Sequence, residues 1–161
     1  MANSDDRRKA PSRRRQGKQI RRKAVVDRAS SSKRSAQMAL IGSKNSKFER
    51  AVRAGLHAAG YRYKLHVRGL PGTPDLVFPA RRKIVFLHSC FWHGHGCRLS
   101  RMPKSNKSYW TKKIASNRAR DARNERALRR SGWRVLSVWE CKYRQSPEKT
   151  VARLGRFLQK M

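Results

Sequence analysis

The stretch KIVFLHSCFWHGHGC, residues 83–97, joins an apolar run to a segment that carries two of the three cysteines and three of the five histidines. The apolar run, 83–88, follows a basic turn and predicts a buried strand. The Gly-His-Gly-Cys segment that ends the stretch would pack poorly in a core, but it suits a flexible loop that carries metal ligands. The stretch therefore predicts a strand that leads directly into a functional loop.

A helix and a second strand are predicted after this loop. Residues 107–131 have the apolar spacing of a long helix that ends at Gly132, and residues 133–140 have the pattern of the next strand. A strand–helix–strand crossover sets its two strands parallel, so their C-terminal ends meet at one edge of the sheet. Cys90 follows one of these ends and Cys141 follows the other. We therefore expect these two cysteines to be neighbours.

The rest of the chain from residue 46 onward completes a predicted mixed α/β domain. A capping box of Ser46 and Glu49 opens a helix that Gly60 closes. The other predicted elements are strands over 61–67 and 75–78, which form a meander with 83–88, and a last helix that starts at the cap Ser146 and turns Val151, Leu154 and Phe157 inward.

The charge of the chain favours nucleic acid as its partner. Forty-two Lys and Arg oppose nine Asp and Glu, which gives a net charge of +33. Such an excess attracts phosphate backbones or anionic lipid. No run of about 20 apolar residues is present to span a bilayer, and the arginine-rich start lacks the apolar stretch of a secretory signal. We expect an intracellular protein that binds nucleic acid and is not in a membrane.

The first 33 residues are predicted to be a disordered basic arm, ahead of a single domain over residues 34–161. Residues 1–34 hold thirteen Lys and Arg and hardly any large apolar residue, a composition that cannot build a core. The arm has two interpretations, a solvated tail or a non-specific DNA tether, and the basic character of the whole chain favours the tether.

Three cysteines and one histidine predict a structural zinc site. An odd number of cysteines cannot pair off as internal disulfides, so a reduced compartment with metal-bound thiolates fits better. Cys90, His95 and Cys97 lie within eight residues, and the predicted crossover adds Cys141. Three thiolates and an imidazole suit tetrahedral zinc with no open position. The alternative is that these cysteines are small core residues.

Among the carboxylates, Asp75 is the candidate for catalysis. The six acids beyond residue 34 are Glu49, Asp75, Asp121, Glu125, Glu140 and Glu148. Most have structural explanations, but Asp75 starts a buried strand, where an unpaired carboxylate is costly unless it meets a cation. Taken alone, Asp75 could be a turn residue after Pro74. Beside His88 and in so basic a chain, it could instead hold Mg²⁺ for phosphodiester hydrolysis.

Five segments in order resemble the very-short-patch repair endonucleases, which nick mismatched DNA in bacteria. The segments are SKNSKFER (43–50), LPGTPDLVF (70–78), IVFLHSCFWHGHGC (84–97), YWTKKIASNRARD (109–121) and GWRVLSVWEC (132–141). The resemblance runs from about Arg34 to Cys141. It implies a restriction endonuclease-like core of the PD-(D/E)XK type, in which helices flank a mixed central sheet, together with a structural zinc site.

The resemblance also implies roles for the predicted catalytic residues. Asp75 matches the aspartate that binds catalytic Mg²⁺, and Glu49 matches a glutamate near it. His93 is similar to the histidine that acts on the attacking water, and His88 to its supporting partner. The implied zinc ligands are Cys90, His95, Cys97 and Cys141. Leu87 replaces a threonine whose main-chain carbonyl contacts the metal, which leucine can also supply.

The implied DNA-binding residues are Met38, Phe91, Trp92, Trp110, Lys113 and Asn117. The three aromatic residues match side chains that wedge into the duplex beside the mismatch. Without the resemblance, Phe91 and Trp92 could equally form a hydrophobic corner that shields the zinc loop, and Trp110 could equally be a core residue of its helix. Lys113 and Asn117 match helix positions that recognise the T:G pair, and Met38 matches an N-terminal residue that approaches it. Asn117 and Asp121 also lie on the inward stripe of the helix, which predicts a site or a hydrogen-bonded network there.

The resemblance thus implies a monomeric, Mg²⁺-dependent endonuclease that nicks one strand at T:G mispairs left by deamination of 5-methylcytosine. It further implies a bacterial, cytoplasmic protein that associates with the nucleoid through DNA and serves alongside a DNA cytosine-5 methyltransferase. Two other hypotheses stay open. One is a non-catalytic, zinc-stabilised DNA-binding protein, and the other is a nuclease of the same fold without mismatch preference.

Overall fold

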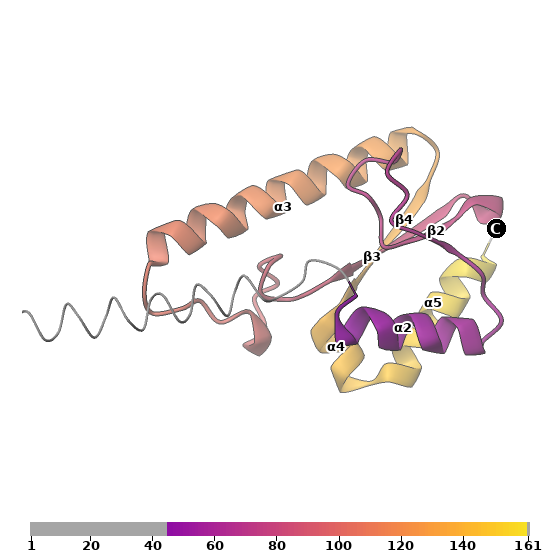
Figure 1. Ribbon diagram of the computed structural model, residues 1–161, viewed down its shortest axis with the longest axis horizontal. Helices are drawn as coiled ribbons and strands as arrows, with labels where there is room; N and C mark the ends of the chain where they lie inside the picture. Colours follow the sequence, from indigo (N-terminus) through magenta and orange to yellow (C-terminus); the bar gives the residue numbers. More distant parts are fainter. Residues whose placement is uncertain (1–44, 161) are drawn as a thin grey trace, which may run out of the picture. The chain divides into compact units, whose positions relative to one another are not determined.

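A four-stranded mixed sheet forms the centre of the domain in the computed structural model, which describes residues 45–160 (Figure 1). The predicted arm, residues 1–33, and Met38 lie outside the described residues. The strands are β1 (Lys64–Leu65), β2 (Leu76–Phe78), β3 (Lys83–His88) and β4 (Arg134–Trp139), and they are arranged in the order β1-β2-β3-β4. The first three pair antiparallel, which confirms the predicted meander.

The crossover from β3 to β4 is the long helix α3 (Lys107–Arg130). β3 and β4 pair in parallel over six residues, from Lys83 opposite Arg134 to His88 opposite Trp139. This pairing confirms the predicted strand–helix–strand unit. Because parallel strands end at the same edge of a sheet, the loop after His88 and the segment after Trp139 start side by side.

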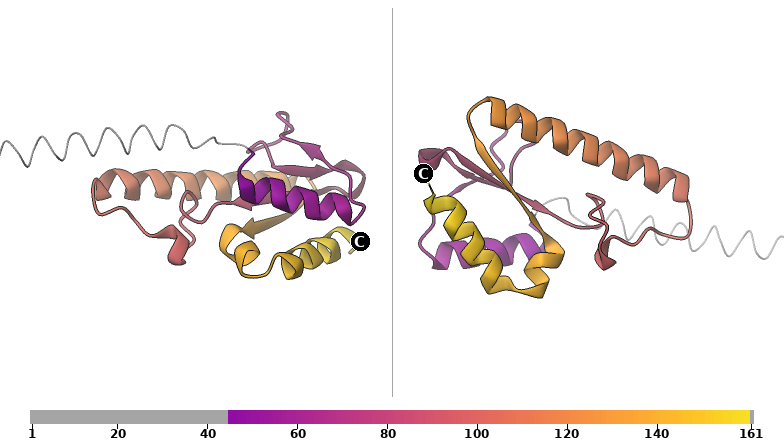
Figure 2. Two further views of the ribbon diagram at one scale, coloured as in Figure 1. Left: turned by 60° about the horizontal axis from the view of Figure 1, so that its bottom comes forward. Right: turned by 180° about the vertical axis from the view of Figure 1, so that it is seen from behind.

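Helices cover both faces of this sheet (Figure 2). α3 covers one face, and the other face carries α2 (Lys47–Ala58), α4 (Glu140–Gln145) and α5 (Pro147–Gln159). The larger core, on the side of α2 and α5, contains Phe48, Val52, Leu56, Leu76, Phe78, Val85, Leu87, Val138, Leu154 and Leu158. The core facing α3 contains Val77, Ile84, Phe86, Leu128 and Val135. Alternate residues of β3 therefore serve two cores, which explains its unbroken apolar sequence.

The first helix begins as its capping box predicts. Ser46 Oγ accepts a hydrogen bond from the Glu49 backbone N–H at 3.2 Å, and a Glu49 carboxylate oxygen accepts one from the Asn45 N–H at 3.0 Å. The first contact satisfies one of the donors that a helix start leaves without a partner, and the second joins the Glu49 carboxylate to the residue before the cap. After the helix, Gly60 adopts the left-handed conformation at φ 84° that ends many helices.

Three predicted elements differ in detail from the structure. The strand predicted over 61–67 is reduced to the two residues of β1, because His66 has a φ of +47° that ends an extended strand. The strand predicted over 133–140 ends at Trp139, and the short helix α4, which was not predicted, begins at Glu140. In α5 the side chain of Ser146 makes no capping hydrogen bond.

The inward face of α5 also differs from its prediction. Its buried residues are Thr150, Leu154 and Leu158, whereas Val151 and Phe157 are half-buried. Within residues 45–160, no helix is both long enough and apolar enough to cross a membrane.

Buried Lys83 joins the start of β3 to the end of α5. Its Nζ donates to the Leu158 carbonyl at 2.9 Å and to the Lys160 carbonyl, and it lies 5.6 Å from the centre of the Phe157 ring. The last carbonyls of a helix lack partners within the helix and carry partial negative charge. The ammonium group therefore caps α5 at its C-terminus.

Replacing this cap should weaken the domain. Lys83→Met keeps the apolar stem but removes the donor, so we expect the free energy of unfolding to fall by about 1–3 kcal/mol. Urea unfolding measures the change, with Lys149→Met on the exposed face of α5 as the control. Equal stability of the two variants would contradict the capping role of Lys83.

Candidate active site and metal-ligand cluster

The C-terminal edge of β3 and β4 carries the predicted zinc ligands. The ligand atoms of Cys90, His95, Cys97 and Cys141 all lie within 4.8 Å of one another. The Cys141 backbone N–H donates to Cys90 Sγ at 3.3 Å, and Cys141 Sγ lies 3.3 Å from His95 Nδ1. The parallel strands thus bring together cysteines from two distant segments, as predicted.

The donor set fits a tetrahedral cation. Cys90 is fully buried, and its burial raises the pKa of the thiol to about 12. A hydrogen bond with His95 lowers the pKa of the more exposed Cys97 to about 6. Three thiols and one imidazole whose ligand atoms lie within 4.8 Å of one another offer few good hydrogen bonds to each other, whereas a bound cation would stabilise the thiols as thiolates.

Helix α3 holds the loop that carries these ligands. Asn117 is buried, and its Nδ2 donates to the Trp92 carbonyl at 2.9 Å. Gly94 has a φ of +59°, and a Cβ atom there would lie 2.5 Å from Ile114 Cγ2. Glycine is therefore needed both for the backbone conformation and for the close approach to α3. This hydrogen bond accounts for the position of Asn117, one of the two polar residues on the inward stripe of the helix.

The second polar residue of that stripe, Asp121, pairs with His93. Their Oδ2 and Nδ1 atoms are 2.6 Å apart. Burial opposes ionisation of Asp121, but the hydrogen bond and the charge of His93 outweigh it and lower the pKa of the carboxyl group. Because a carboxylate accepts, the proton shared with Asp121 lies on His93 Nδ1, so the neutral form of this ring has its lone pair on Nε2. Such a nitrogen can act as a general base.

His88 lies directly against His93. The ring centres are 4.1 Å apart, and His88 Nδ1 or Nε2 lies within 4.8 Å of the ligand atoms of His93 and Asp121. Burial, followed by the charge of His93, lowers the pKa of His88 to about 4. His88 is therefore neutral at neutral pH, as expected for a partner that supports His93 without competing for its proton.

Asp75 lies beside the backbone that leads into His88. Its Oδ2 accepts a hydrogen bond from the Leu87 N–H at 2.8 Å. Partial burial raises the pKa of Asp75, and the nearby charge of Glu49 adds to this effect. Such a carboxylate favours an added cation. Asp75 therefore fits the predicted metal-binding role, with the Leu87 backbone next to it.

Both carboxylate oxygens of Glu49 accept hydrogen bonds from neighbouring groups. Oε1 accepts from Ser46 Oγ, and Oε2 accepts from the Asn45 N–H and from Arg53 Nη2, each at 3.0 Å. Arg53 was not predicted from the sequence, yet it is buried, donates to Asn45 Oδ1 at 2.6 Å and lies 3.3 Å from His66 Nε2. Glu49 is thus an anchored charge beside Asp75, and its predicted catalytic role stays a prediction.

The predicted aromatic wedge forms one cluster next to the loop. The ring centres of Phe91, Trp92 and Trp110 are 5.1 to 5.8 Å from one another, and all three rings are half-buried. Tyr109, which was not predicted, joins the cluster 5.1 Å from Trp110 and is 53% exposed. Lys113 is exposed on α3 one turn further along. This group can present stacking surface to a base.

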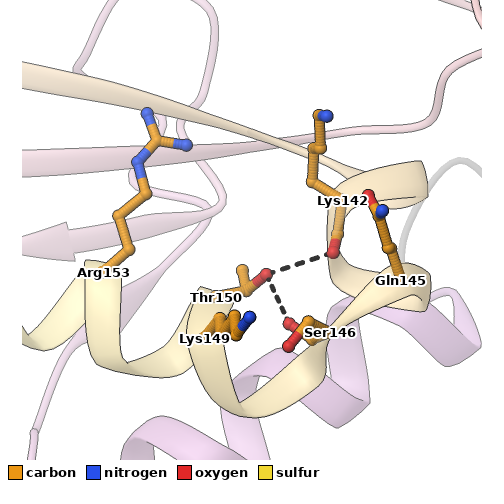
Figure 3. Close-up of a pocket in the computed structure, with 6 residues that line it drawn as sticks. All are labelled: Lys142, Gln145, Ser146, Lys149, Thr150 and Arg153. Carbon is orange, nitrogen blue, oxygen red and sulfur yellow. Dashed lines mark hydrogen bonds between the residues drawn. The ribbon is translucent and has the colours of Figure 1, made fainter.

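A basic depression lies where α4 meets α5 (Figure 3). It has a volume of about 530 Å³ and is lined by Lys142, Gln145, Ser146, Lys149, Thr150 and Arg153. The side chains of Lys142 and Arg153 point the same way, on either side of Thr150, as Figure 3 shows. Thr150 Oγ1 donates to the Ser146 carbonyl at 3.0 Å, which holds this corner together. The depression can accept phosphate groups.

Neutralising Asp75 should stabilise the protein. An acid whose pKa is raised by folding contributes stability at low pH and loses it as the pH rises through the folded pKa. At neutral pH the ionised Asp75 therefore costs stability, and Asp75→Asn should raise the free energy of unfolding by about 1 kcal/mol. Urea unfolding at pH 7 without divalent cations measures this, with the exposed Glu148→Gln as the control. A destabilised Asp75→Asn variant would contradict the interpretation.

Comparison with known proteins identifies the family of the chain. The family model "DNA mismatch endonuclease Vsr" matches residues 26–99. A type II nicking enzyme, V.XorIIP of Xanthomonas oryzae pv. oryzae, is 55% identical over 117 residues, which cover 73% of this chain and 86% of that protein. The DNA mismatch endonuclease Vsr of Escherichia coli is 38% identical over 120 residues, 74% of this chain and 75% of that protein. The chain belongs to the Vsr family of DNA mismatch endonucleases.

Proposed function

We propose that this protein nicks one strand of duplex DNA at a T:G mispair, the product of 5-methylcytosine deamination, and so starts very-short-patch repair. Its relatives bear the names of nicking enzymes and a mismatch endonuclease, and its net charge of +33 suits a DNA substrate. The observation that carries the proposal is the His93–Asp121 pair at the edge where Asp75 meets β3.

The chain's own residues suffice for the proton transfer. His93 Nε2 accepts a proton from the attacking water, and the Asp121 carboxylate stabilises the imidazolium that results. Neutral His88 keeps the neighbouring space free of a second positive charge. Asp75 and the Leu87 main-chain carbonyl are the groups that would hold Mg²⁺. When bound, Mg²⁺ neutralises the scissile phosphate and acidifies water.

The aromatic cluster and α3 are proposed to recognise the mismatch. Insertion of Phe91, Trp92 and Trp110 beside the mispair exchanges base stacking for stacking on protein rings. Lys113 and Asn117 are proposed to read the T:G pair, with Met38 approaching it. In this role Asn117 would use its carbonyl oxygen or its second N–H, since one N–H donates to the Trp92 carbonyl. The arm, residues 1–33, and the basic depression would bind phosphates without reading sequence.

The wider assignment follows the family. We propose that the mixed sheet is a restriction endonuclease-like core of the PD-(D/E)XK type and that the four-residue cluster holds structural zinc. The enzyme would act as a monomer in the bacterial cytoplasm, associated with the nucleoid, and would accompany a DNA cytosine-5 methyltransferase that creates the lesion's precursor.

A nicking assay tests the function. The chain should nick a T:G duplex with Mg²⁺, nick a matched duplex far less, and nick neither in EDTA. Equal nicking of both duplexes would indicate a nuclease without mismatch preference. No nicking with retained binding would indicate a DNA-binding protein alone.

Asp75→Asn should abolish nicking while mismatch binding survives. Unchanged nicking would show that Asp75 is not an active-site residue.

Metal analysis tests the zinc site. Protein purified without added metal should contain about one zinc per chain, since a Cys3His set binds zinc tightly. Cys141→Ser should lose the metal and unfold at lower urea concentration, because the ends of β3 and β4 would no longer be bound to one ion. Full retention of zinc by this variant would contradict the assignment.

A further inference from the structure

Trp139, the last residue of β4, contacts two imidazole rings. Its ring centre is 4.2 Å from that of His95, and the two planes are 19° apart. The His88 ring centre is 5.1 Å away, and its plane is tilted by 44°. His88 packs against His93 at 4.1 Å, and His93 is bonded to Asp121. A continuous column of side chains therefore runs from the metal-ligand cluster to the histidine–aspartate pair.

The sheet fixes the indole in this column. Trp139 is paired with His88 across the parallel strands, and alternation along β4 puts it on the same face as Val135 and Ser137. Val135 belongs to the core facing α3, and Ser137 Oγ donates to the Glu125 carboxylate of α3. The backbone position of Trp139 is thus set by strand pairing and by the contacts that Val135 and Ser137 of the same strand make with α3.

His95, which stacks on Trp139, and His93, which packs on His88, depend more on the loop. His93 and His95 belong to a segment in which Gly94 and Gly96 have φ values of +59° and +81°. Glycines leave a loop many accessible conformations, so contacts with a fixed neighbour must select one of them. The metal-ligand cluster holds one end of the segment, and stacking on the sheet-borne indole orients the rings between the cluster and Asp121.

We infer that Trp139 is a positioning residue for nicking. Through its contacts with His95 and His88, it couples the position of the metal-ligand cluster to the orientation of the His93 ring. The inference rests on the proposed function, because it concerns the rate of that reaction. Trp139 touches neither substrate nor reacting atoms in this role. Its contribution is geometric, and a misplacement of about 1 Å at a catalytic group can lower a rate by about 100-fold.

The first test replaces the indole by a side chain that cannot stack. Trp139→Leu should retain about one zinc and bind the T:G duplex in EDTA as the unsubstituted chain does. Its single-turnover nicking rate should fall by about 10- to 100-fold, and Trp139→Phe should recover most of the rate. Trp133→Leu is the matched control, since Trp133 precedes β4 at its other end and packs on the same face and against Arg82.

The second test removes the His95 imidazole that stacks on Trp139 but keeps the metal site. His95→Cys creates a set of four thiolates, which zinc accepts equally well, but leaves Trp139 without its stacked imidazole. Nicking should fall as in Trp139→Leu, and the two changes combined should cost little more than either alone, because both break the same column. If Trp139→Leu does not fold, His95→Cys tests the inference in its place.

The outcomes separate the inference from the proposed function. Nicking of T:G duplexes by the unsubstituted chain establishes the function independently of any variant, and its absence overturns both. Given that activity, a Trp139→Leu rate equal to that of Trp133→Leu overturns the positioning role. So does a zinc-loaded His95→Cys variant that nicks at the full rate. Parallel losses of nicking and binding in Trp139→Leu would mean that the indole serves stability alone.

Discussion

The parallel pairing of β3 with β4 is the constraint on which the candidate site depends. Six consecutive residue pairs fix the register and set His88 opposite Trp139. An antiparallel partner would have brought the start of β4, with Trp133, to the end of β3. Parallel pairing instead brings Cys141 to Cys90. The crossover helix enforces this arrangement, since a parallel neighbour cannot be reached by a tight turn.

The same crossover helix supplies the second wall of the site. α3 has 24 residues, which gives a rod of about 36 Å that runs past the sheet to the loop after β3. Its inward stripe changes from apolar Leu128 over the sheet to polar Asp121 and Asn117 over the loop, where each binds a loop group. Polar residues on an inward stripe are costly only if they lack partners. Here the partners are His93 and the Trp92 carbonyl, in the loop that carries the metal-ligand cluster.

Local patterns and topology allowed much of this to be predicted from the sequence. The cysteine cluster followed from strand order, and the polar stripe indicated a network on α3. The sequence did not indicate which loop groups Asn117 and Asp121 bind, because that depends on the positive φ of Gly94 and Gly96. Nor did it indicate the stack of Trp139 on His95, which requires both the sheet register and the loop conformation. His66 likewise shortened a strand whose alternation looked complete.

The few acids of the domain are placed where the site or the fold uses them. Of the six beyond residue 34, five accept hydrogen bonds from defined donors: Glu49, Asp75, Asp121, Glu125 and Glu140. The sixth, Glu148, lies in the first turn of α5, where the helix dipole favours negative charge. A stray carboxylate on a surface that binds DNA would repel phosphates and lower affinity. In a chain this basic, each of these carboxylates therefore has a local partner or a helix start that accounts for its negative charge.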